Sequence, residues 1–286
     1  MSALAGARSL LFTPAGDARK ADKALAGAAD LVVLDLEDAI PPGRKDEARH
    51  WLAGYLADGP PRAHVAAWVR INAPDTPWGA ADLTAITDLP VAGLMLPKAS
   101  AQALDAIATM TPPDKALPVI ALIETARGLR EAYQVASRGH VAALMLGGAD
   151  LGAELNWIPR PDGLELLHAR SSLVLDSAAA GIRPPFDVVR IDYRDAEGLI
   201  AEATAARSLG FGGKACVHPD QVGPVNEVFS PSREELDAAR EIVAAFEAAR
   251  GQGHGVAVAG GRMVDQPVAA RARALLASAG SMVEGC

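Results

Sequence analysis

The chain has 286 residues, of which 50% are hydrophobic and only 4% aromatic, and its formal net charge is −8. This length allows one large domain or two ordinary ones, and the apolar content is sufficient for a substantial core. The acidic balance argues against nucleic acid or an anionic membrane as the main partner, and no run of 18 apolar residues predicts a membrane span.

Short aliphatic runs alternate with longer Ala-rich stretches, a pattern typical of strands followed by helices. In chain order, the expected strands are 9–13, 31–36, 65–71, 93–96, 119–123, 143–146, 188–191 and 214–217. The expected helices are 17–27, 43–57, 79–88, 100–110, 126–138, 162–181, 194–209 and 219–228. Eight such units predict an α/β fold, a (β/α)8 TIM barrel. An open doubly wound sheet is the alternative, but "TPAGDARK" lacks its G-x-G-x-x-G fingerprint.

Residues beyond the eighth unit exceed what a barrel needs. We expect a catalytic barrel domain over 1–230 and a C-terminal helical extension over 231–286, beginning at "SREELDAAR". The extension either covers its own barrel or reaches a neighbouring subunit. The cysteines Cys216 and Cys286 show no disulfide pattern, and the N-terminus has no secretory signal, so we expect a cytoplasmic protein.

Polar residues follow the predicted strands, where the catalytic groups of such barrels lie. Glu124 and Asp150 each end an apolar run, and two carboxylates with room for waters suit Mg²⁺. Each could instead cap the helix that follows it. No His/Cys cluster has the spacing of a zinc site.

Arg70 ends the third strand, and a guanidinium there either binds a substrate carboxylate or forms a structural ion pair with Glu37 or Asp38. Lys98 could attract a phosphate or be a solvated loop residue, and Lys20 in the first loop could hold an anionic tail or belong to an ordinary helix start. Arg8, at the start of the first strand, is a further candidate for substrate binding. His218 precedes a proline and is expected to shape a turn.

Several motifs occur together in a specific order: "RSLLFTPAGD", "LDLEDA", "VRIN", "GLMLPKAS", "IETARG", "GGADL", "GKACVHPDQ" and "MVDQPV". From Arg8 to about Ala279 the chain resembles the citrate lyase beta-subunit-like branch of the HpcH/HpaI aldolase superfamily, which includes malyl-CoA and citramalyl-CoA lyases. One departure is "PAG", where the family usually has Pro-Gly at the end of the first strand.

The resemblance implies a barrel with an extension, assembled as a homotrimer or homohexamer. It implies Mg²⁺ on Glu124 and Asp150, and a 2-keto acid on Arg70. Residues Glu37 and Asp38 would hold metal-bound water and the arginine.

The resemblance also implies a CoA thioester near Lys20 and Lys98. The residue that matches the catalytic aspartate supplied by an adjacent subunit is Asp265, in "MVDQPV".

The expected activity is reversible cleavage of a 3-hydroxyacyl-CoA to an acyl-CoA and a 2-keto acid. Three alternatives stay open at this point. The chain could be the beta subunit of a citrate lyase complex, a metal-dependent aldolase acting on free hydroxy-keto acids, or a non-catalytic subunit that binds CoA esters.

Overall fold

The computed structural model describes residues 4–57, 65 and 67–283. The chain divides into two compact units, Met1–Phe229 and Ser230–Cys286. The division falls one residue before the one expected from the sequence. Among the described residues, no helix is both long and apolar enough to cross a membrane.

The first unit is a closed barrel of eight parallel strands in the order β1 to β8, so the predicted TIM barrel is confirmed and the open sheet is excluded. The strands are β1 (Ser9–Pro14), β2 (Leu31–Asp35), β3 (Ala67–Arg70), β4 (Gly93–Leu96), β5 (Val119–Ile123), β6 (Val141–Leu146), β7 (Phe186–Asp187) and β8 (Gly213–Cys216).

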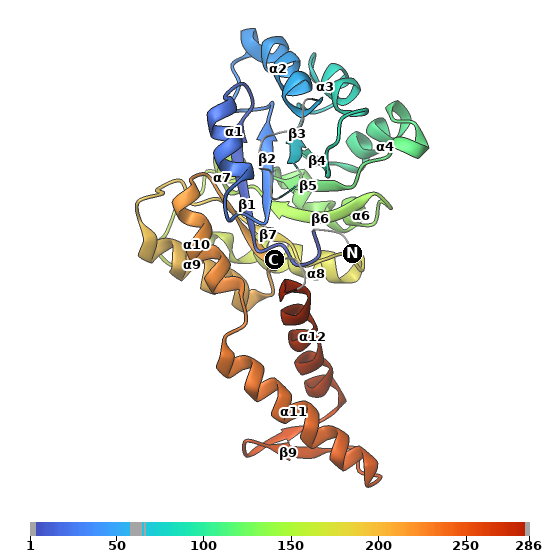
Figure 1. Ribbon diagram of the computed structural model, residues 1–286, viewed down its shortest axis with the longest axis vertical. Coiled ribbons are helices and arrows are strands. Elements are labelled where there is room, and N and C mark those ends of the chain that lie inside the picture. Colours follow the sequence, from blue (N-terminus) through green and yellow to red (C-terminus); the bar gives the residue numbers. More distant parts are fainter. Residues whose placement is uncertain (1–3, 58–64, 66, 284–286) are drawn as a thin grey trace. The chain divides into compact units, whose positions relative to one another are not determined.

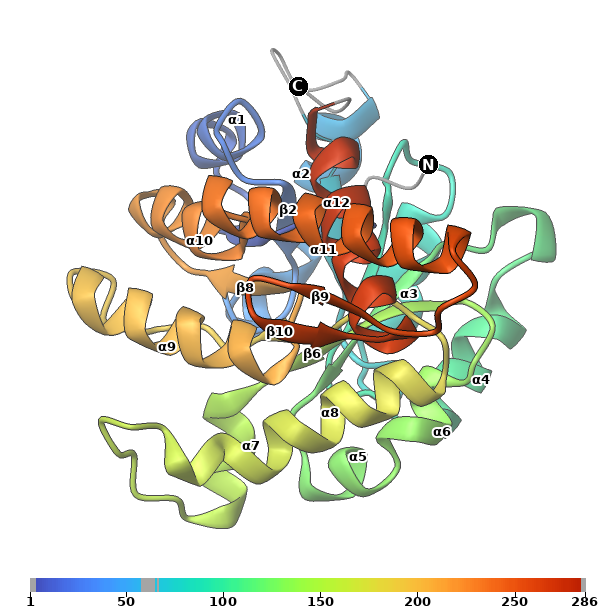
Figure 2. The same ribbon diagram turned by 90° about the horizontal axis from the view of Figure 1, so that it is seen from below.

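Helices surround the strands, as Figures 1 and 2 show. They are α1 (Ala18–Leu25), α2 (Lys45–Ala57), α3 (Gly79–Ile86), α4 (Ala101–Met110), α5 (Ala126–Arg130), α6 (Ala132–Ala136), α7 (Gly148–Leu155), α8 (Leu167–Ala179), α9 (Ala196–Leu209) and α10 (Val222–Phe229). Short 3-10 turns are η1 (Pro42–Arg44), η2 (Pro113–Lys115), η3 (Leu164–Leu166) and η4 (Pro219–Gln221).

The seventh strand was predicted wrongly over 188–191, because the β-branched run there looks like a strand. Its hydrogen-bonding groups are instead taken by side chains: Lys214 donates to the carbonyl of Val188 at 2.6 Å and Gln221 to that of Arg190 at 2.8 Å. The true strand, β7, is the preceding pair of residues, and it places Phe186 in the interior. Helix α7 was not predicted, since it begins at a glycine and has a glycine as its N-cap.

The strands separate two layers of core. Residues at alternate positions fill the barrel interior, among them Leu31 and Val33 on β2 and Trp68 on β3, while their neighbours pack outward against the helices. The interior is a packed core and not a channel. Any polar residue that continues the inward series past the last apolar layer therefore lies at the mouth of the barrel.

The second unit has its own small core. Helix α11 (Arg233–Gly251) begins with a capping box between Ser232 and Glu235, as the sequence suggested. A two-stranded hairpin, β9 (Ala257–Ala259) and β10 (Arg262–Val264), leads to α12 (Gln266–Val283), and the two strands run side by side in Figure 2. Its core cluster consists of Phe246, Ala259, Val264 and Ala269.

Candidate active site

Arg70 is held at the mouth of the barrel by Asp35, its register partner on the neighbouring strand. Asp35 follows Val33 and Arg70 follows Trp68 by two residues, so both side chains continue the inward series. The pair is bidentate, with 2.7 Å from Nε to Oδ1 and 2.6 Å from Nη2 to Oδ2, and both residues are buried. This geometry fixes the guanidinium plane.

Two further acids surround the same guanidinium. Nη1 lies 2.8 Å from Glu37 Oε2 and 3.6 Å from the exposed carboxylate of Asp38. Burial acts to lower the pKa of Arg70, but hydrogen bonding to Asp35 and the surrounding negative charges raise it above its ordinary value. Burial likewise raises the pKa of Glu37, against the opposing charge of Arg70. The ion pairs expected with Glu37 and Asp38 are therefore present, but Asp35, to which the sequence assigned no role, is the main partner.

Glu124 follows β5 on the inward series and does not cap the next helix. That cap is Thr125, whose hydroxyl accepts from the Gly128 amide at 2.9 Å. The carboxylate of Glu124 is buried and accepts from the backbone amide of Lys98 at 2.8 Å. Burial raises the pKa of Glu124 to about 8, with Glu37 and Asp150 adding to the shift against the Lys98 amide and charge.

Asp150 lies in the first turn of α7, one strand further round the barrel, with its carboxylate 45% exposed. Two glycines lead into this turn. A Cβ on Gly147 would meet Glu124 Cβ at 2.5 Å and Oε2 at 2.9 Å, so only glycine lets the β6–α7 connection pass so close to the acid. The turn therefore brings both carboxylates to one side of the mouth.

Lys98 joins these acids and is not a freely solvated loop residue. Its backbone is in the left-handed region, with φ 47°, and its amide hydrogen bond to Glu124 accompanies this unusual conformation. Its Nζ lies 3.2 Å from Glu37 Oε1, 3.7 Å from Asp150 Oδ2 and 4.0 Å from Glu124 Oε1. Burial opposes the charge of Lys98, but the neighbouring carboxylates raise its pKa.

The donor set fits Mg²⁺ better than a softer metal. Within the described ranges, no three His, Cys, Asp or Glu residues converge as a complete metal cage. Glu124 and Asp150 supply two hard oxygen donors beside a cavity, and Mg²⁺ characteristically combines one or two carboxylates with waters and substrate oxygens. The glycine at position 147 leaves room for the Glu124 carboxylate, and the Lys98 amide holds it there.

A cavity of about 450 Å³ opens over these residues. Its polar lining includes Asp35, Asp38, Arg70, Glu124 and Asp150, and its apolar lining includes Phe12, Leu122, Met145, Val189 and Val217. An apolar hollow with a few convergent polar groups is typical of a small-molecule binding site.

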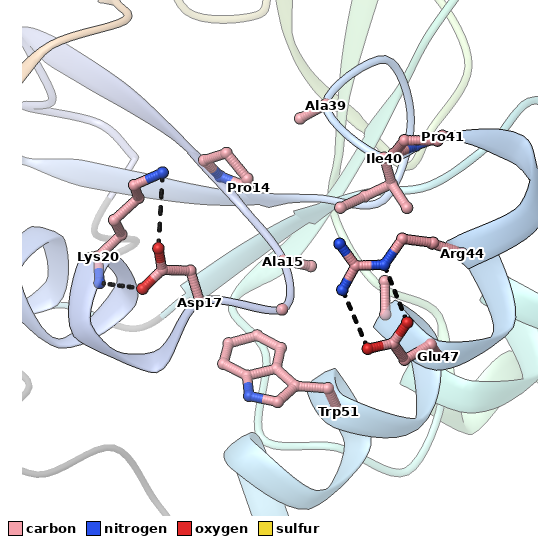
Figure 3. Close-up of a pocket in the computed structure, with 12 residues that line it drawn as sticks. Pro14, Ala15, Asp17, Lys20, Ala39, Ile40, Pro41, Arg44, Glu47 and Trp51 are labelled. Atoms are coloured by element: carbon pink, nitrogen blue, oxygen red, sulfur yellow. Dashed lines mark hydrogen bonds and ion pairs between the residues drawn. The ribbon is translucent and has the colours of Figure 1, made fainter.

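A second groove, of about 640 Å³, shares Phe12, Thr13, Pro14 and Val217 with the cavity and so continues it outward. Its basic lining residues are Arg19, Lys20 and Lys23, all from α1. Lys20 also borders a smaller hollow of about 280 Å³, drawn in Figure 3, where its ammonium pairs with the carboxylate of Asp17. Lys20 thus lies both in the first turn of α1 and on a basic groove, and its binding of an anionic tail stays a prediction.

Three further positions were predicted or left open by the sequence, and one of them, His218, lines the second groove. Arg8 is at the opposite, N-terminal end of β1, where it forms a bidentate pair with Asp30 (2.9 Å to each oxygen), so the structure does not bring it to the site. His218 is the N-cap of η4 and stacks on Tyr193 at 4.6 Å, which agrees with its expected role in a turn. Asp265, in the second unit, caps α12 through the amide of Val268 at 3.1 Å.

Residues 8–219 match the family model for HpcH/HpaI aldolase/citrate lyase. The chain belongs to this aldolase and citrate lyase family. Among curated proteins, this aldolase-family chain is 38% identical over 275 residues to a (3S)-malyl-CoA thioesterase of Cereibacter sphaeroides, covering 95% of the chain and 94% of the relative. It is 33% identical over 282 residues to the citrate lyase subunit beta of Escherichia coli K12, covering 95% and 93%.

Among solved structures, this aldolase-family chain resembles CitE of Mycobacterium tuberculosis in complex with magnesium, acetoacetate and coenzyme A. The TM-score is 0.81 and the identity 37%, over 97% of the chain and 99% of that structure. Family membership makes this a lyase-type enzyme.

Proposed function

We propose that the protein reversibly cleaves a 3-hydroxyacyl-CoA, of the malyl-CoA, methylmalyl-CoA or citramalyl-CoA type, to an acyl-CoA and a 2-keto acid. The observation that carries this proposal is the fixed Arg70 guanidinium beside Glu124 and Asp150 in one cavity. A guanidinium and a two-carboxylate metal site are complementary to the carboxylate and oxygen atoms of a 2-keto acid.

Glu124 and Asp150 would hold Mg²⁺, which would supply Lewis acidity at the substrate oxygens when bound. Arg70 has more N–H donors than Asp35 and Glu37 occupy, and it lines the cavity, so it would bind the keto-acid carboxylate and stabilise developing negative charge. Glu37 and Asp38 would orient the guanidinium and bound water. The apolar wall at Leu122, Met145 and Val189 would exclude bulk water from the reacting carbon atoms.

The CoA portion would lie along the groove that continues the cavity. Its nucleotide phosphates are anionic, and Arg19, Lys20 and Lys23 are the cations that the groove offers. The relative solved with coenzyme A supports a ligand of this class. Lys98 would act at the inner end, where its Nζ faces the acids of the cavity, and not at the phosphates.

Asp265 would protonate the enolate carbon that cleavage leaves, or remove a proton from the acyl-CoA in condensation. It would come from an adjacent copy in a homotrimer or homohexamer. Its position directly after β10, at the start of α12, gives the carboxylate a defined conformation.

A second candidate is hydrolysis of the same class of thioester, favoured by the 38% identity to (3S)-malyl-CoA thioesterases. Hydrolysis and C–C cleavage share the substrate but differ in products. Malyl-CoA gives acetyl-CoA and glyoxylate by C–C cleavage, and malate and free CoA by hydrolysis.

The deciding experiment incubates the purified chain alone with malyl-CoA or citramalyl-CoA, with Mg²⁺ or with EDTA, and identifies products by mass. Condensation is tested with acetyl-CoA or propionyl-CoA and a panel of 2-keto acids. Acyl-CoA plus keto acid, formed only with Mg²⁺, supports the lyase. Free CoA without keto acid supports the thioesterase, turnover only with partner subunits supports a citrate lyase component, and binding without turnover supports a non-catalytic subunit.

A further inference from the structure

A buried ammonium group lies directly behind the acids that hold Arg70. Lys45, at the start of α2, is 6% exposed and lines none of the three hollows described above. Its Nζ donates to the carbonyls of Leu36 and Glu37, at 2.9 and 2.7 Å, and to Asn72 Oδ1 at 2.8 Å. An ammonium has three N–H donors, so all of them are engaged, and all engage the segments that follow β2 and β3.

A second layer holds the acceptors of Lys45 in turn. Asn72 donates from Nδ2 to the carbonyl of Leu36 at 3.0 Å and from its backbone amide to Asp82 Oδ2 at 2.9 Å. Asp82 is fully buried and accepts from Arg49 Nε at 2.8 Å. The network therefore runs from α2 and α3 through the end of β3 to the backbone on both sides of Glu37.

Glu37 depends on this network because it lies beyond the end of β2, where no strand ladder fixes its backbone. Its amide donates to Asp35 Oδ1 at 2.8 Å, and its carbonyl accepts from Lys45 Nζ at 2.7 Å and from the Ile40 amide at 2.9 Å. With both backbone groups fixed, its carboxylate reaches Arg70 on one side and Lys98 on the other.

We infer that Lys45 is a positioning residue, which fixes the Glu37 backbone so that the Glu37 carboxylate orients Arg70 toward the keto acid. The expected effect on keto-acid binding rests on the proposed function, whereas the expected effect on the position of Glu37 rests on the structure alone. A buried lysine also contributes to stability, so the test must separate the two effects.

The test compares Lys45→Met with Lys214→Met. Lys214 on β8 is the control, since it too is a buried lysine that donates to a backbone carbonyl (Val188) beyond a strand. It lies two strands round the barrel from β2 and pairs with Asp187 and Glu202 instead of contacting the Glu37 segment. With both variants shown to be folded by circular dichroism, Lys45→Met is expected to raise KM for the 2-keto acid about tenfold, and to leave KM for the acyl-CoA within about twofold. Lys214→Met is expected to leave both constants within about twofold.

Lys45→Arg, which keeps donors at this position, is expected to recover part of the keto-acid affinity. If Lys45→Met does not fold, Asn72→Ala weakens the same network from its other side and is expected to change KM in the same direction. The inference would be overturned if folded Lys45→Met or folded Asn72→Ala had the wild-type KM for the 2-keto acid. It would also be overturned if Lys214→Met raised this KM as much as Lys45→Met does.

A crystal structure of Lys45→Met gives a readout independent of turnover. The Glu37 carboxylate is expected to move beyond 4 Å from Arg70 Nη1, compared with 2.8 Å here. An unmoved Glu37 contradicts the inference even if the wild-type protein has no lyase activity. Conversely, a moved Glu37 in a protein that uses no 2-keto acid refutes the proposed function and retains the positioning role.

Discussion

Asp35 and Arg70 are register partners on adjacent parallel strands, and their side chains form a bidentate ion pair at the mouth of the barrel. Such a pair fixes the guanidinium in plane and direction, which a point-charge contact would not do. The site is therefore built around an arginine whose Nε and Nη2 are held from the neighbouring strand, while Glu37, beyond the strand end, holds Nη1.

Replacing either member of this pair should impair the reaction through geometry. Arg70→Lys keeps the charge but loses the fork, and we expect kcat/KM to fall about 100-fold; Asp35→Asn should have a loss of similar size. The double variant should be little worse than the poorer single variant, because the two residues act as a unit. Arg160→Lys is the control, since Arg160 forms an equally close bidentate pair with Asp162 at an exposed position. Additive losses would show that the pair is not the functional unit.

The raised pKa of Glu124 should be visible in metal-free stability. Its value is about 8 in the fold against 4.5 ordinarily, so the folded state binds more protons between these limits. The free energy of unfolding should therefore fall as pH rises through this window, by up to about 1.4 kcal/mol per pH unit from this group. Denaturation in EDTA at pH 5 to 8 checks this, with Glu124→Gln as the comparison. If the free energy of unfolding changed with pH equally in the wild type and in Glu124→Gln, the raised pKa of Glu124 would be contradicted.

Gly147→Ala should disturb the metal site without touching a charged group. The added Cβ would lie 2.9 Å from Glu124 Oε2, so the carboxylate must move. We expect Mg²⁺ affinity, measured by titration calorimetry, to fall at least about tenfold. Gly139→Ala is the control, because a Cβ there meets nothing within 4 Å. Unchanged Mg²⁺ binding in Gly147→Ala would mean that Glu124 is not a metal ligand.

Asp265→Asn separates chemistry from helix capping. Asparagine caps a helix as well as aspartate does, so α12 should keep its stability, while kcat should fall about 10²- to 10⁴-fold from loss of the acid/base group. Mg²⁺ binding should remain near that of the wild type. Asp265→Ala should in addition lose about 1 kcal/mol of capping energy.

The subunit origin of Asp265 can be tested by mixing inactive variants. Asp265→Asn and Arg70→Lys proteins, dissociated and reassembled together, should regain activity if each site combines residues of two copies. Mixtures that stay as inactive as the separate variants would place both residues in one subunit's site or leave Asp265 without a catalytic role.

The sequence predicted most of the barrel because periodicity and spacing are local properties. It failed at β7 and α7, where tertiary contacts override local preference. Lys214 and Gln221 take the carbonyls of a strand-like run, and α7 begins at two glycines, of which Gly147 makes room for Glu124 and Gly148 for Val188. These contacts join residues far apart in the sequence, and spacing alone does not reveal them.

Within the site, the acids and Arg70 were predictable as strand-end residues, but their pairing was not. The inward series Leu31, Val33, Asp35 was a usable signal for the true partner of Arg70. No sequence pattern indicated the left-handed conformation of Lys98 or the hydrogen bonds of Lys45, since both depend on how separate loops meet. The extension was predicted to exist, but a sequence carries no direct measure of what it covers.

The short strand β7 leaves a seam in the barrel, which is the weakly paired region where β7 joins β6 and β8. It has one registered pair with β6 and two with β8, whereas β1 and β2 share five. Beyond β7 the wall is joined by single side-chain bonds from Lys214 and Gln221. In native-state hydrogen exchange, the backbone amides of β7 and of the segment that follows it should exchange through openings of lower free energy than those of β1 to β5. Asp35, Arg70 and Glu124 stand on or directly after β2, β3 and β5, so the barrel can loosen at its seam without separating the strands that hold the chemistry.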